Sequence, residues 1–289
     1  MADDLKTPPG LDALSRRGFS ALSVAAGVTI AASSSVRAAE GAVVETDVTV
    51  KTADGVCDAA FFHPAGKGKW PAVLVWTDAL GLRPAFRDMG RRLASSGYAV
   101  LVPNPFYRTA KAPVLGPGFD FNNPTDRAKL VPLMGPLTPD AVSRDAVAYV
   151  AFLDSQRVVN LKAKAGVVGY CMGGPDTLRT AAALPDRIGA GCSFHGGGLV
   201  TDKPDSPHLL ASKIKASYYF GIATNDDQRQ PDAKDKLREA FAAAKLPATI
   251  EVYEGAQHGW CVPDGAVYNH DQAERAWGNM LTLYKAALV

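Results

Sequence analysis

The feature that most constrains this chain is a cysteine between glycines, set between an apolar run and a predicted helix. Residues 165–169 are small and apolar, as in a strand buried on both faces of a sheet, and residues 172–184 are predicted to be helical. Between them lies the sequence Gly169-Tyr170-Cys171-Met172-Gly173-Gly174. A turn this tight leaves no room for side chains at positions 169 and 173. We therefore expect Cys171 at the end of a buried strand, with its sulfur near the N-terminus of a helix.

Apolar runs and helical patterns alternate along the rest of the chain. A hairpin is predicted at residues 43–51 and 56–62, and eight prolines between 103 and 139 indicate loops and short helices that cover a site. The other predicted strands are residues 72–76, 98–102, 165–169, 188–194, 216–222 and 249–253, and the predicted helices are one around Phe86 and residues 140–153, 172–184, 232–244 and 270–288. This alternation predicts an α/β fold, with a mostly parallel central sheet and helices on both faces.

The N-terminal residues have the features of an export signal. The paired arginines in Ser15-Arg16-Arg17-Gly18-Phe19 precede an uncharged, Ala/Ser-rich stretch, and small residues follow at Ala38-Ala39. The stretch is short for a membrane span and resembles a twin-arginine leader. We expect residues 1–39 to be a cleaved leader that directs the protein to the periplasm or outside a bacterium, and residues 40–289 to form one domain. The alternative is an Ala-rich tail with two chance arginines.

Charge and cysteine usage exclude several classes of protein. The sum of charged residues, 31 basic and 29 acidic, gives a formal charge of +2, which is no basic field for nucleic acid. The four cysteines, Cys57, Cys171, Cys192 and Cys261, form no C-x-x-C pair and no cluster with histidine. Neither structural zinc nor a disulfide framework is predicted. We expect no metal, no cofactor, no membrane span after the leader, and a small molecule as the binding partner.

A thiol nucleophile needs a base, and His258 is the best-placed histidine. It follows the last predicted strand into a Gly-flanked loop, at the same sheet edge as Cys171. The acid should follow the strand at 216–222, where Asp226 and Asp227 are adjacent. We favour Asp226, although either aspartate could take the imidazole N–H. The order nucleophile, acid, histidine is that of the α/β-hydrolase fold.

Backbone N–H groups are needed where an oxyanion would form. The N–H of Met172 follows the nucleophile directly, and the loop after residues 72–76 offers the N–H of Ala79. Asp78 is then a carboxylate near the thiol, or simply a residue that opens the loop through an Asx turn. The sequence His195-Gly196-Gly197-Gly198 is like the oxyanion motif of lipases, but it follows the nucleophile, so we interpret it as a turn lining the pocket.

The chain resembles the dienelactone hydrolase (carboxymethylenebutenolidase) family from residue 43 to residue 288. The pieces that carry the resemblance are Trp76-Thr77-Asp78-Ala79-Leu80-Gly81-Leu82, Gly97-Tyr98-Ala99-Val100, Pro103-Asn104-Pro105, Gly169-Tyr170-Cys171-Met172-Gly173-Gly174, Ala223-Thr224-Asn225-Asp226, Gln257-His258-Gly259-Trp260 and Tyr268-Asn269. The resemblance implies a triad of Cys171, Asp226 and His258. It also implies a carboxylate in the position of Asp78 that pairs with the resting thiol. Family members commonly have Glu there, one methylene longer.

These features together predict a hydrolase that cleaves a small ester or an enol lactone, such as a dienelactone, through a thioester on Cys171. Tyr107, Arg108, His195 and Trp260 are the residues expected to contact substrate. Two alternatives remain open. One is a broad carboxylesterase or peptidase on the same scaffold. The other is a redox protein with Cys171 as a sensor thiol, for which Cys192 and Cys261 are the candidate resolving cysteines.

Overall fold

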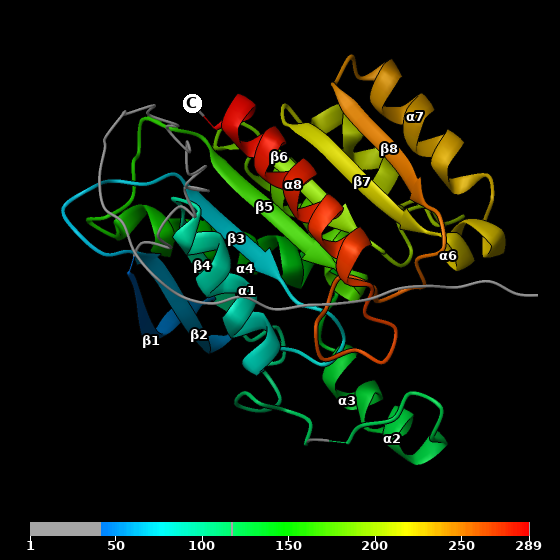
Figure 1. The fold of residues 1–289 in the computed structure, drawn as a ribbon, viewed down its shortest axis with the longest axis horizontal. Helices are drawn as coiled ribbons and strands as arrows, with labels where there is room; N and C mark the ends of the chain where they lie inside the picture. The colour runs from blue at the N-terminus through cyan, green and yellow to red at the C-terminus, as the bar shows by residue number, and fades with distance from the viewer. Residues whose placement is uncertain (1–41, 117, 289) are drawn as a thin grey trace, which may run out of the picture. The chain divides into compact units, whose positions relative to one another are not determined.

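The computed structural model describes residues 42–116 and 118–288, which build a sheet of eight strands between two layers of helices (Figure 1). The strands are β1 (Val43–Thr52), β2 (Gly55–Pro64), β3 (Ala72–Trp76), β4 (Ala99–Pro103), β5 (Ala165–Tyr170), β6 (Ile188–Phe194), β7 (Ser217–Ala223) and β8 (Ala248–Tyr253). Their order in the sheet is β1-β2-β4-β3-β5-β6-β7-β8. The hairpin β1–β2 and the β2–β4 pair are antiparallel, and every pairing from β4 to β8 is parallel.

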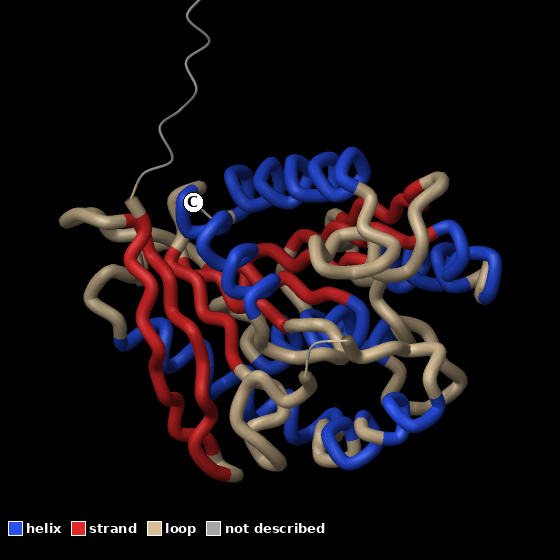
Figure 2. The backbone as a smooth tube through the Cα atoms, turned by 60° about the horizontal axis from the view of Figure 1, so that its bottom comes forward, coloured by secondary structure: helices blue, strands red, loops and turns tan. Residues whose placement is uncertain are grey.

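The helices lie on both faces of this sheet, which confirms the predicted fold class. They are α1 (Pro84–Ser95), α2 (Pro124–Ala128), α3 (Leu130–Met134), α4 (Pro139–Ser155), α5 (Gly174–Ala183), α6 (Thr224–Arg229), α7 (Ala233–Ala243) and α8 (His270–Ala287), with the 3-10 turns η1 (Cys171–Gly173) and η2 (Pro207–Lys213). Figure 2 shows the strands as one twisted layer with helices on either side, and α2 and α3 outside both helix layers.

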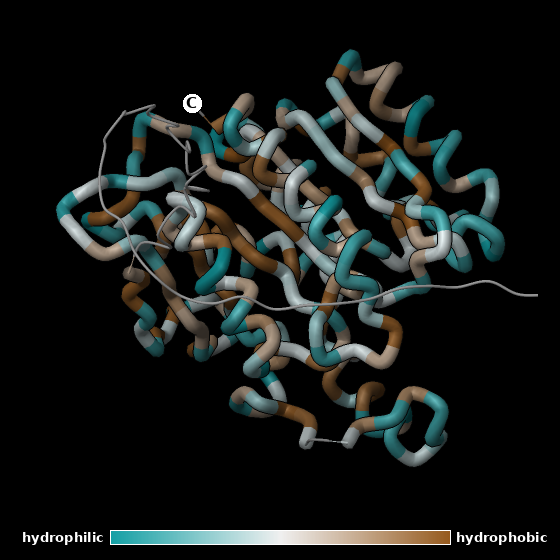
Figure 3. Tube along the Cα trace, viewed as in Figure 1, coloured by the Kyte–Doolittle hydropathy of each residue, from teal (hydrophilic) through white to brown (hydrophobic). Residues whose placement is uncertain are grey.

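Two hydrophobic cores hold the layers together, one on each face of the sheet. Because side chains alternate along a strand, Val73 and Val75 of β3 face one way and Leu74 faces the other. The first face packs against α1 and α8, and the second against α4, α5 and α7. Each fully buried large side chain contributes about 1.5–3 kcal/mol. Figure 3 shows the most hydrophobic colouring along the central strands, as expected for strands covered on both faces.

Helix boundaries agree with the sequence except near the sheet's edge. Thr138 caps α4 by accepting the N–H of Ala141 at 3.2 Å, and Pro139 is its first residue, so the predicted helix at 140–153 is confirmed. The helix predicted from residue 172 begins instead as the 3-10 turn η1, because the glycine turn is too tight for α-helical geometry. A short helix, α6, stands where a loop was expected.

The carboxyl ends of the parallel strands meet at one edge of the sheet. Cys171 follows β5, His195 follows β6, and the segments carrying Asp226 and His258 follow β7 and β8. Open α/β sheets bind their ligands at this edge. Within residues 42–116 and 118–288, no helix is both long enough and apolar enough to cross a bilayer.

Candidate active site

The turn that carries Cys171 has no room for side chains at its two flanking glycines. A Cβ added to Gly169 would lie 2.0 Å from the carbonyl oxygen of Gly173, and one added to Gly173 would lie 2.6 Å from that of Thr77. Cys171 itself has a φ of 52°, in the left-handed region that side-chain-bearing residues rarely adopt. This backbone geometry presents its sulfur beyond the end of β5, as the sequence predicts.

Cys171, His258 and Asp226 are joined by a chain of hydrogen bonds. Nε2 of His258 lies 3.1 Å from Sγ of Cys171, and Nδ1 lies 2.6 Å from Oδ2 of Asp226. Asn225, which the sequence analysis did not single out, accepts the backbone N–H of His258 at 2.8 Å and so fixes the loop that carries the ring. The three side chains come from three different strand ends, and their arrangement is that of a nucleophile, a base and an orienting acid.

Of the two adjacent aspartates, Asp227 is bound by Lys234 and Asp226 contacts the imidazole. Both carboxylate oxygens of Asp227 bind Nζ of Lys234, at 2.6 and 2.8 Å, so this side chain faces α7. Asp226 faces His258 and has Arg229 at 3.5 Å on its outer side. The structure therefore brings Asp226, and not Asp227, into contact with the imidazole.

The hydrogen bonds of His258 change its acidity. Burial of the ring lowers its pKa, but the hydrogen bonds to Asp226 and Cys171 and the charges of both groups outweigh burial and raise the pKa to about 10. The ring is therefore an imidazolium at neutral pH, with Sγ of Cys171 on one side and Asp226 on the other. A cationic ring at this position suits a thiol nucleophile, because a positive charge beside a sulfur stabilises the thiolate form.

Asp78 does not pair with the thiol. Its two carboxylate oxygens bind Nη1 and Nη2 of Arg83 at 2.7 and 2.9 Å, and Oδ1 also accepts the N–H of Leu80 at 2.9 Å. The Arg83 guanidinium is held from its other side by Asp264 at 2.7 Å. The short aspartate side chain and this bidentate bond keep the carboxylate in its own loop, so the partner of the thiol among the described residues is His258.

A cavity of about 390 Å³ opens beside Cys171. Its lining is mostly apolar and includes Ala79 and Met172, the two residues predicted to offer oxyanion N–H groups. The lining residues are Ala79, Met134, Leu137, Cys171, Met172, Pro175, Asp176, Arg179, Gly197 and His258. Met134 and Leu137 come from the proline-rich segment between β4 and α4. No periodicity in that segment marks them as lining residues.

Two charged residues of this cavity, Asp176 and Arg179, escaped the sequence analysis. They lie on the face of α5 that also carries Pro175, and Met172 lies just before it in η1. The spacing of three and four residues between these positions, directly after the cysteine, is the signal by which they could have been found. Burial raises the pKa of Asp176 to about 7, although the charge of Arg179 lowers it. The side chain of Arg179 is 13% exposed, and its Nε lies 3.8 Å from Oδ1 of Asp176.

Three residues predicted to contact substrate are engaged elsewhere. The hydroxyl of Tyr107 donates to Asp145 at 2.8 Å, and Arg108 binds Asp145 and Asp54 at 2.8 and 2.6 Å. Both side chains thus join the β1–β2 hairpin to α4, because Asp145 is buried and needs these donors. Trp260 is fully buried and stacks on Tyr253, with ring centroids 4.9 Å apart.

His195 also differs from its predicted position on the pocket wall. Its side chain is buried beneath the cysteine turn, and its Nδ1 accepts the backbone N–H of Cys171 at 3.1 Å. Its ring is in edge contact with the rings of His258 and Trp260, at centroid distances of 5.2 and 5.0 Å.

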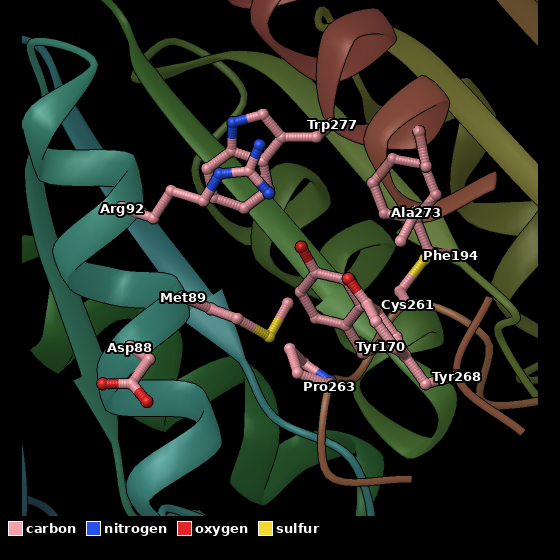
Figure 4. Close-up of a pocket in the computed structure, with 11 residues that line it drawn as sticks. Asp88, Met89, Arg92, Tyr170, Phe194, Cys261, Pro263, Tyr268, Ala273 and Trp277 are labelled. Carbon is pink, nitrogen blue, oxygen red and sulfur yellow. The ribbon is translucent and has the colours of Figure 1, made fainter. Parts of the chain in front are cut away.

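The remaining thiols are buried and far less acidic than a free cysteine. Burial raises the pKa of Cys57 to about 12 and also raises the pKa values of Cys192 and Cys261. All four cysteines are free thiols. Cys261 lines a second cavity, of about 110 Å³, together with Tyr170 and Trp277 (Figure 4). Neither Cys171 nor His258 lines that cavity.

No metal site is visible in the described part of the chain. Residues 42–116 and 118–288 contain no group of three or more His, Cys, Asp or Glu side chains arranged to hold an ion.

Comparison with known proteins identifies related chains. A protein provisionally named carboxymethylenebutenolidase from Methylorubrum extorquens is 30% identical over 285 residues, which are 95% of this chain and 94% of the relative. The carboxymethylenebutenolidase of Rhodococcus opacus is 28% identical over 194 residues, which are 67% of this chain and 71% of the relative.

Solved structures share the fold. A provisionally named dienelactone hydrolase from Klebsiella pneumoniae has a TM-score of 0.73 at 23% identity, over 85% of this chain and 99% of that one. A dienelactone hydrolase-like promiscuous phosphotriesterase from metagenomic libraries has a TM-score of 0.70 at 23% identity, over 86% of this chain and all of the other. The family model for dienelactone hydrolases matches residues 57–288, which contain every residue of the site. The chain is a hydrolase and belongs to the dienelactone hydrolase family.

Proposed function

We propose that this protein hydrolyses a small ester or enol lactone, such as a dienelactone, through a thioester on Cys171. The observation that carries the proposal is the unbroken chain from Sγ of Cys171 through His258 to Asp226, with bonds of 3.1 and 2.6 Å, at the wall of a cavity of about 390 Å³. A redox role is less well supported, because buried Cys192 and Cys261 with raised pKa values are poor resolving thiols.

In the first step, the sulfur of Cys171 attacks the carbonyl carbon and forms a C–S bond. The electron pair of the carbonyl moves to its oxygen, where the N–H groups of Met172 and Ala79, both at the cavity wall, are proposed to stabilise it. Collapse restores the carbonyl and breaks the C–O bond, and His258 gives its proton to the leaving alcohol or enolate. Because a thiolate leaves more readily than an amine, esters with stabilised leaving groups suit this site better than amides.

The second step depends on how acylation changes His258. Once sulfur is part of a thioester, the thiolate charge and its hydrogen bond no longer raise the pKa of the ring. The imidazole then remains neutral and takes a proton from water, while Asp226 holds Nδ1–H. Hydroxide attacks the thioester, and the collapse of that intermediate breaks the C–S bond and releases the acid and the Cys171 thiolate.

Arg179 at the cavity wall favours a substrate that carries a negative charge. Apolar side chains from Met134, Leu137 and Pro175 suit the carbon skeleton of a small ester. Arg179 is a cation at the wall of this cavity outside the chain of hydrogen bonds from Cys171 to Asp226, and it lies 3.8 Å from Asp176, which burial keeps partly protonated at neutral pH. An incoming carboxylate would give the guanidinium the close partner that it lacks among the described residues.

The proposed mechanism is tested by replacing the sulfur. C171A should abolish hydrolysis of 4-nitrophenyl acetate, and the wild-type enzyme quenched during turnover should carry one acetyl group on the peptide that contains Cys171. C57S is the matched control, because a serine hydroxyl can replace the Cys57 thiol in its contacts with Asn104 and Tyr149. Full activity in C171A would remove the thioester mechanism from this enzyme.

We also propose that residues 1–39 are a twin-arginine-type leader and that residues 40–289 form the exported enzyme. The support is the Arg16-Arg17 pair and the small residues at Ala38-Ala39, all of which lie outside the described residues. Cell fractionation tests this: the wild-type chain should reach the periplasm in a shortened form, and a variant with both arginines replaced by lysine should remain in the cytoplasm at full length.

A further inference from the structure

The loop after β6 holds both backbone polar groups of Cys171. The N–H of Cys171 donates to Nδ1 of His195 at 3.1 Å, and the carbonyl oxygen of Cys171 accepts the N–H of Gly197 at 3.1 Å. We call this segment, residues 195–197, the backbone clamp. The clamp binds both the N–H and the carbonyl oxygen of Cys171, the proposed nucleophile. The proposed mechanism does not include residues 195–197.

The clamp meets a need that the turn itself creates. Cys171 has a φ of 52°, a conformation that costs free energy and takes its N–H out of the strand ladder. The last paired residues of β5 and β6 are Tyr170 and Phe194, so the ladder ends one residue before the cysteine. Without His195, the N–H of Cys171 would be partly buried without an acceptor, and the left-handed backbone would lose a bond that favours it.

The clamp packs directly against the start of α5. A Cβ on Gly174 would lie 2.5 Å from the Cα of Gly196, and a Cβ on Gly196 would lie 2.5 Å from Oγ of Ser193. Glycine at 174 thus allows the two segments to approach this closely, and glycine at 196 leaves room for the buried side chain of Ser193. Close packing thus explains the glycine at 196, whereas a Cβ on Gly197 or Gly198 would meet nothing within 4 Å.

The bond to Cys171 also fixes the protonation of His195. An Nδ1 that accepts an N–H carries no proton of its own, so the ring proton is on Nε2. Nε2 is buried and has no hydrogen-bond partner among the described residues. The edge contacts of the ring with His258 and Trp260 surround it with aromatic faces. Burial and the nearby charge of His258 lower the pKa of His195, so the ring stays neutral and does not repel the imidazolium.

We propose that His195, with its ring proton on its own Nε2, is a positioning residue. It holds the backbone of Cys171 and the edge of the His258 ring, so that Sγ of Cys171 and Nε2 of His258 stay in contact. The proposal rests on the proposed function, because it assigns the clamp to the thiol chemistry of Cys171. It gives His195 no contact with substrate: the residue acts through Cys171 and His258.

Two substitutions of His195 distinguish the role of Nδ1 as a hydrogen-bond acceptor from the role of the ring in packing. In H195N, the amide oxygen takes the place of Nδ1, and asparagine tolerates the φ of 41° found at this position. In H195F, the ring volume and its edge contacts remain but the acceptor is lost. We expect H195F to lose about 10- to 100-fold in kcat, the effect of leaving a buried N–H without an acceptor, with KM within about threefold of wild type. H195N should recover most of kcat.

The rate of Cys171 alkylation by iodoacetamide gives a second readout that needs no substrate. It should fall in H195F in parallel with kcat and return in H195N. Wild-type kcat and alkylation in H195F, an H195N variant as impaired as H195F, or an effect confined to KM would each overturn the inference. The same assays on C171A separate the two proposals: an active C171A contradicts the proposed function, whereas an inactive C171A with a fully active H195F contradicts only the role of His195.

The tautomer can be measured on the wild-type protein, whether or not H195F folds. Nitrogen-15 NMR distinguishes protonated from unprotonated ring nitrogens, and His195 should show an unprotonated Nδ1 and a protonated Nε2 across neutral pH. H195N, which carries no ring, identifies the signals of this residue by their loss. A proton on Nδ1 would contradict the hydrogen bond from Cys171 and with it the proposal.

Discussion

The guanidinium of Arg179 lies 3.8 Å from the carboxylate of Asp176, at the wall of the cavity that contains Cys171. This separation is too long for a hydrogen bond, although both side chains are largely buried. Among the described residues, this carboxylate is the acidic group that pairs with Arg179, so the guanidinium retains donors for a further partner. We therefore expect Arg179 to affect which substrates the enzyme prefers, and Asp176 to affect how stability changes with pH.

The first prediction concerns substrate charge. We expect R179Q to lower kcat/KM about tenfold or more for the 4-nitrophenyl monoester of glutaric acid, the usual effect of losing a hydrogen-bonded charge pair. For 4-nitrophenyl valerate, which has the same chain length and a terminal methyl group, the change should stay within about threefold. Steady-state kinetics on the two esters measures the ratio. Equal losses on both esters would mean that Arg179 shapes the cavity without selecting charge.

The second prediction concerns the stability cost of Asp176. Burial raises its pKa from 3.8 to about 7, so the folded state favours the protonated form. Its contribution to stability is therefore greatest at low pH and is lost as the pH rises through 7. We expect D176N to become more stable than wild type with rising pH, with the difference growing by roughly 2 kcal/mol between about pH 5 and pH 8.

Urea unfolding at the two pH values measures this difference. D205N, at an exposed aspartate, serves as the control for the removal of one negative charge. If the difference in unfolding free energy between D176N and wild type does not change with pH, Asp176 has its ordinary pKa in the folded protein.

The third prediction concerns the proton of His258. With a pKa of about 10, its imidazole NMR signals should not titrate between about pH 6 and pH 9 in the resting enzyme. In C171A the pKa should fall, because two of the effects that raise it come from Cys171. The folded-state pKa exceeds the ordinary value of 6.5, so this proton stabilises the fold fully below pH 6.5 and the effect is lost toward pH 10. Titration of the wild-type ring near its ordinary value would contradict the ion pair.

The fourth prediction uses the two adjacent aspartates as a matched pair. D226N removes the acceptor of the His258 N–H and should lower kcat by about 100-fold or more, as expected when the base loses its orienting acid. D227N removes a partner of Lys234 outside the chain of hydrogen bonds and should leave kcat within about twofold of wild type. Comparable losses in both variants would indicate a general effect on α6.

Much of the fold and the general position of the site could be predicted from the sequence. The alternation of apolar runs and helical patterns predicts the parallel sheet, and the carboxyl ends of parallel strands share one edge. That geometry was enough to expect Cys171 and the loop of His258 at a common edge. Asp226 and Asp227 could not be separated, because the direction of each side chain depends on Lys234 in α7.

The rest of the site depends on contacts between segments that no local pattern reveals. Asp78 was expected near the thiol, but Arg83 binds both of its oxygens. Tyr107 and Arg108 were expected at the cavity, but the buried carboxylate of Asp145 recruits them. His195 was expected at the pocket wall, and its bond to the Cys171 N–H becomes visible only when β5 and β6 are paired.

The segment between β4 and α4 supplies cavity residues without contributing a strand. It leaves the sheet at Pro103, carries α2 and α3, and returns at the capped start of α4, while the two hydrophobic cores are built largely from other parts of the chain. Beyond Tyr107 and Arg108, which bind the buried Asp145, its length and composition can therefore drift during evolution at little expense to folding. For protein engineers, it is the natural place to graft a different lid and so retarget the enzyme while leaving the thiol and its partners in position.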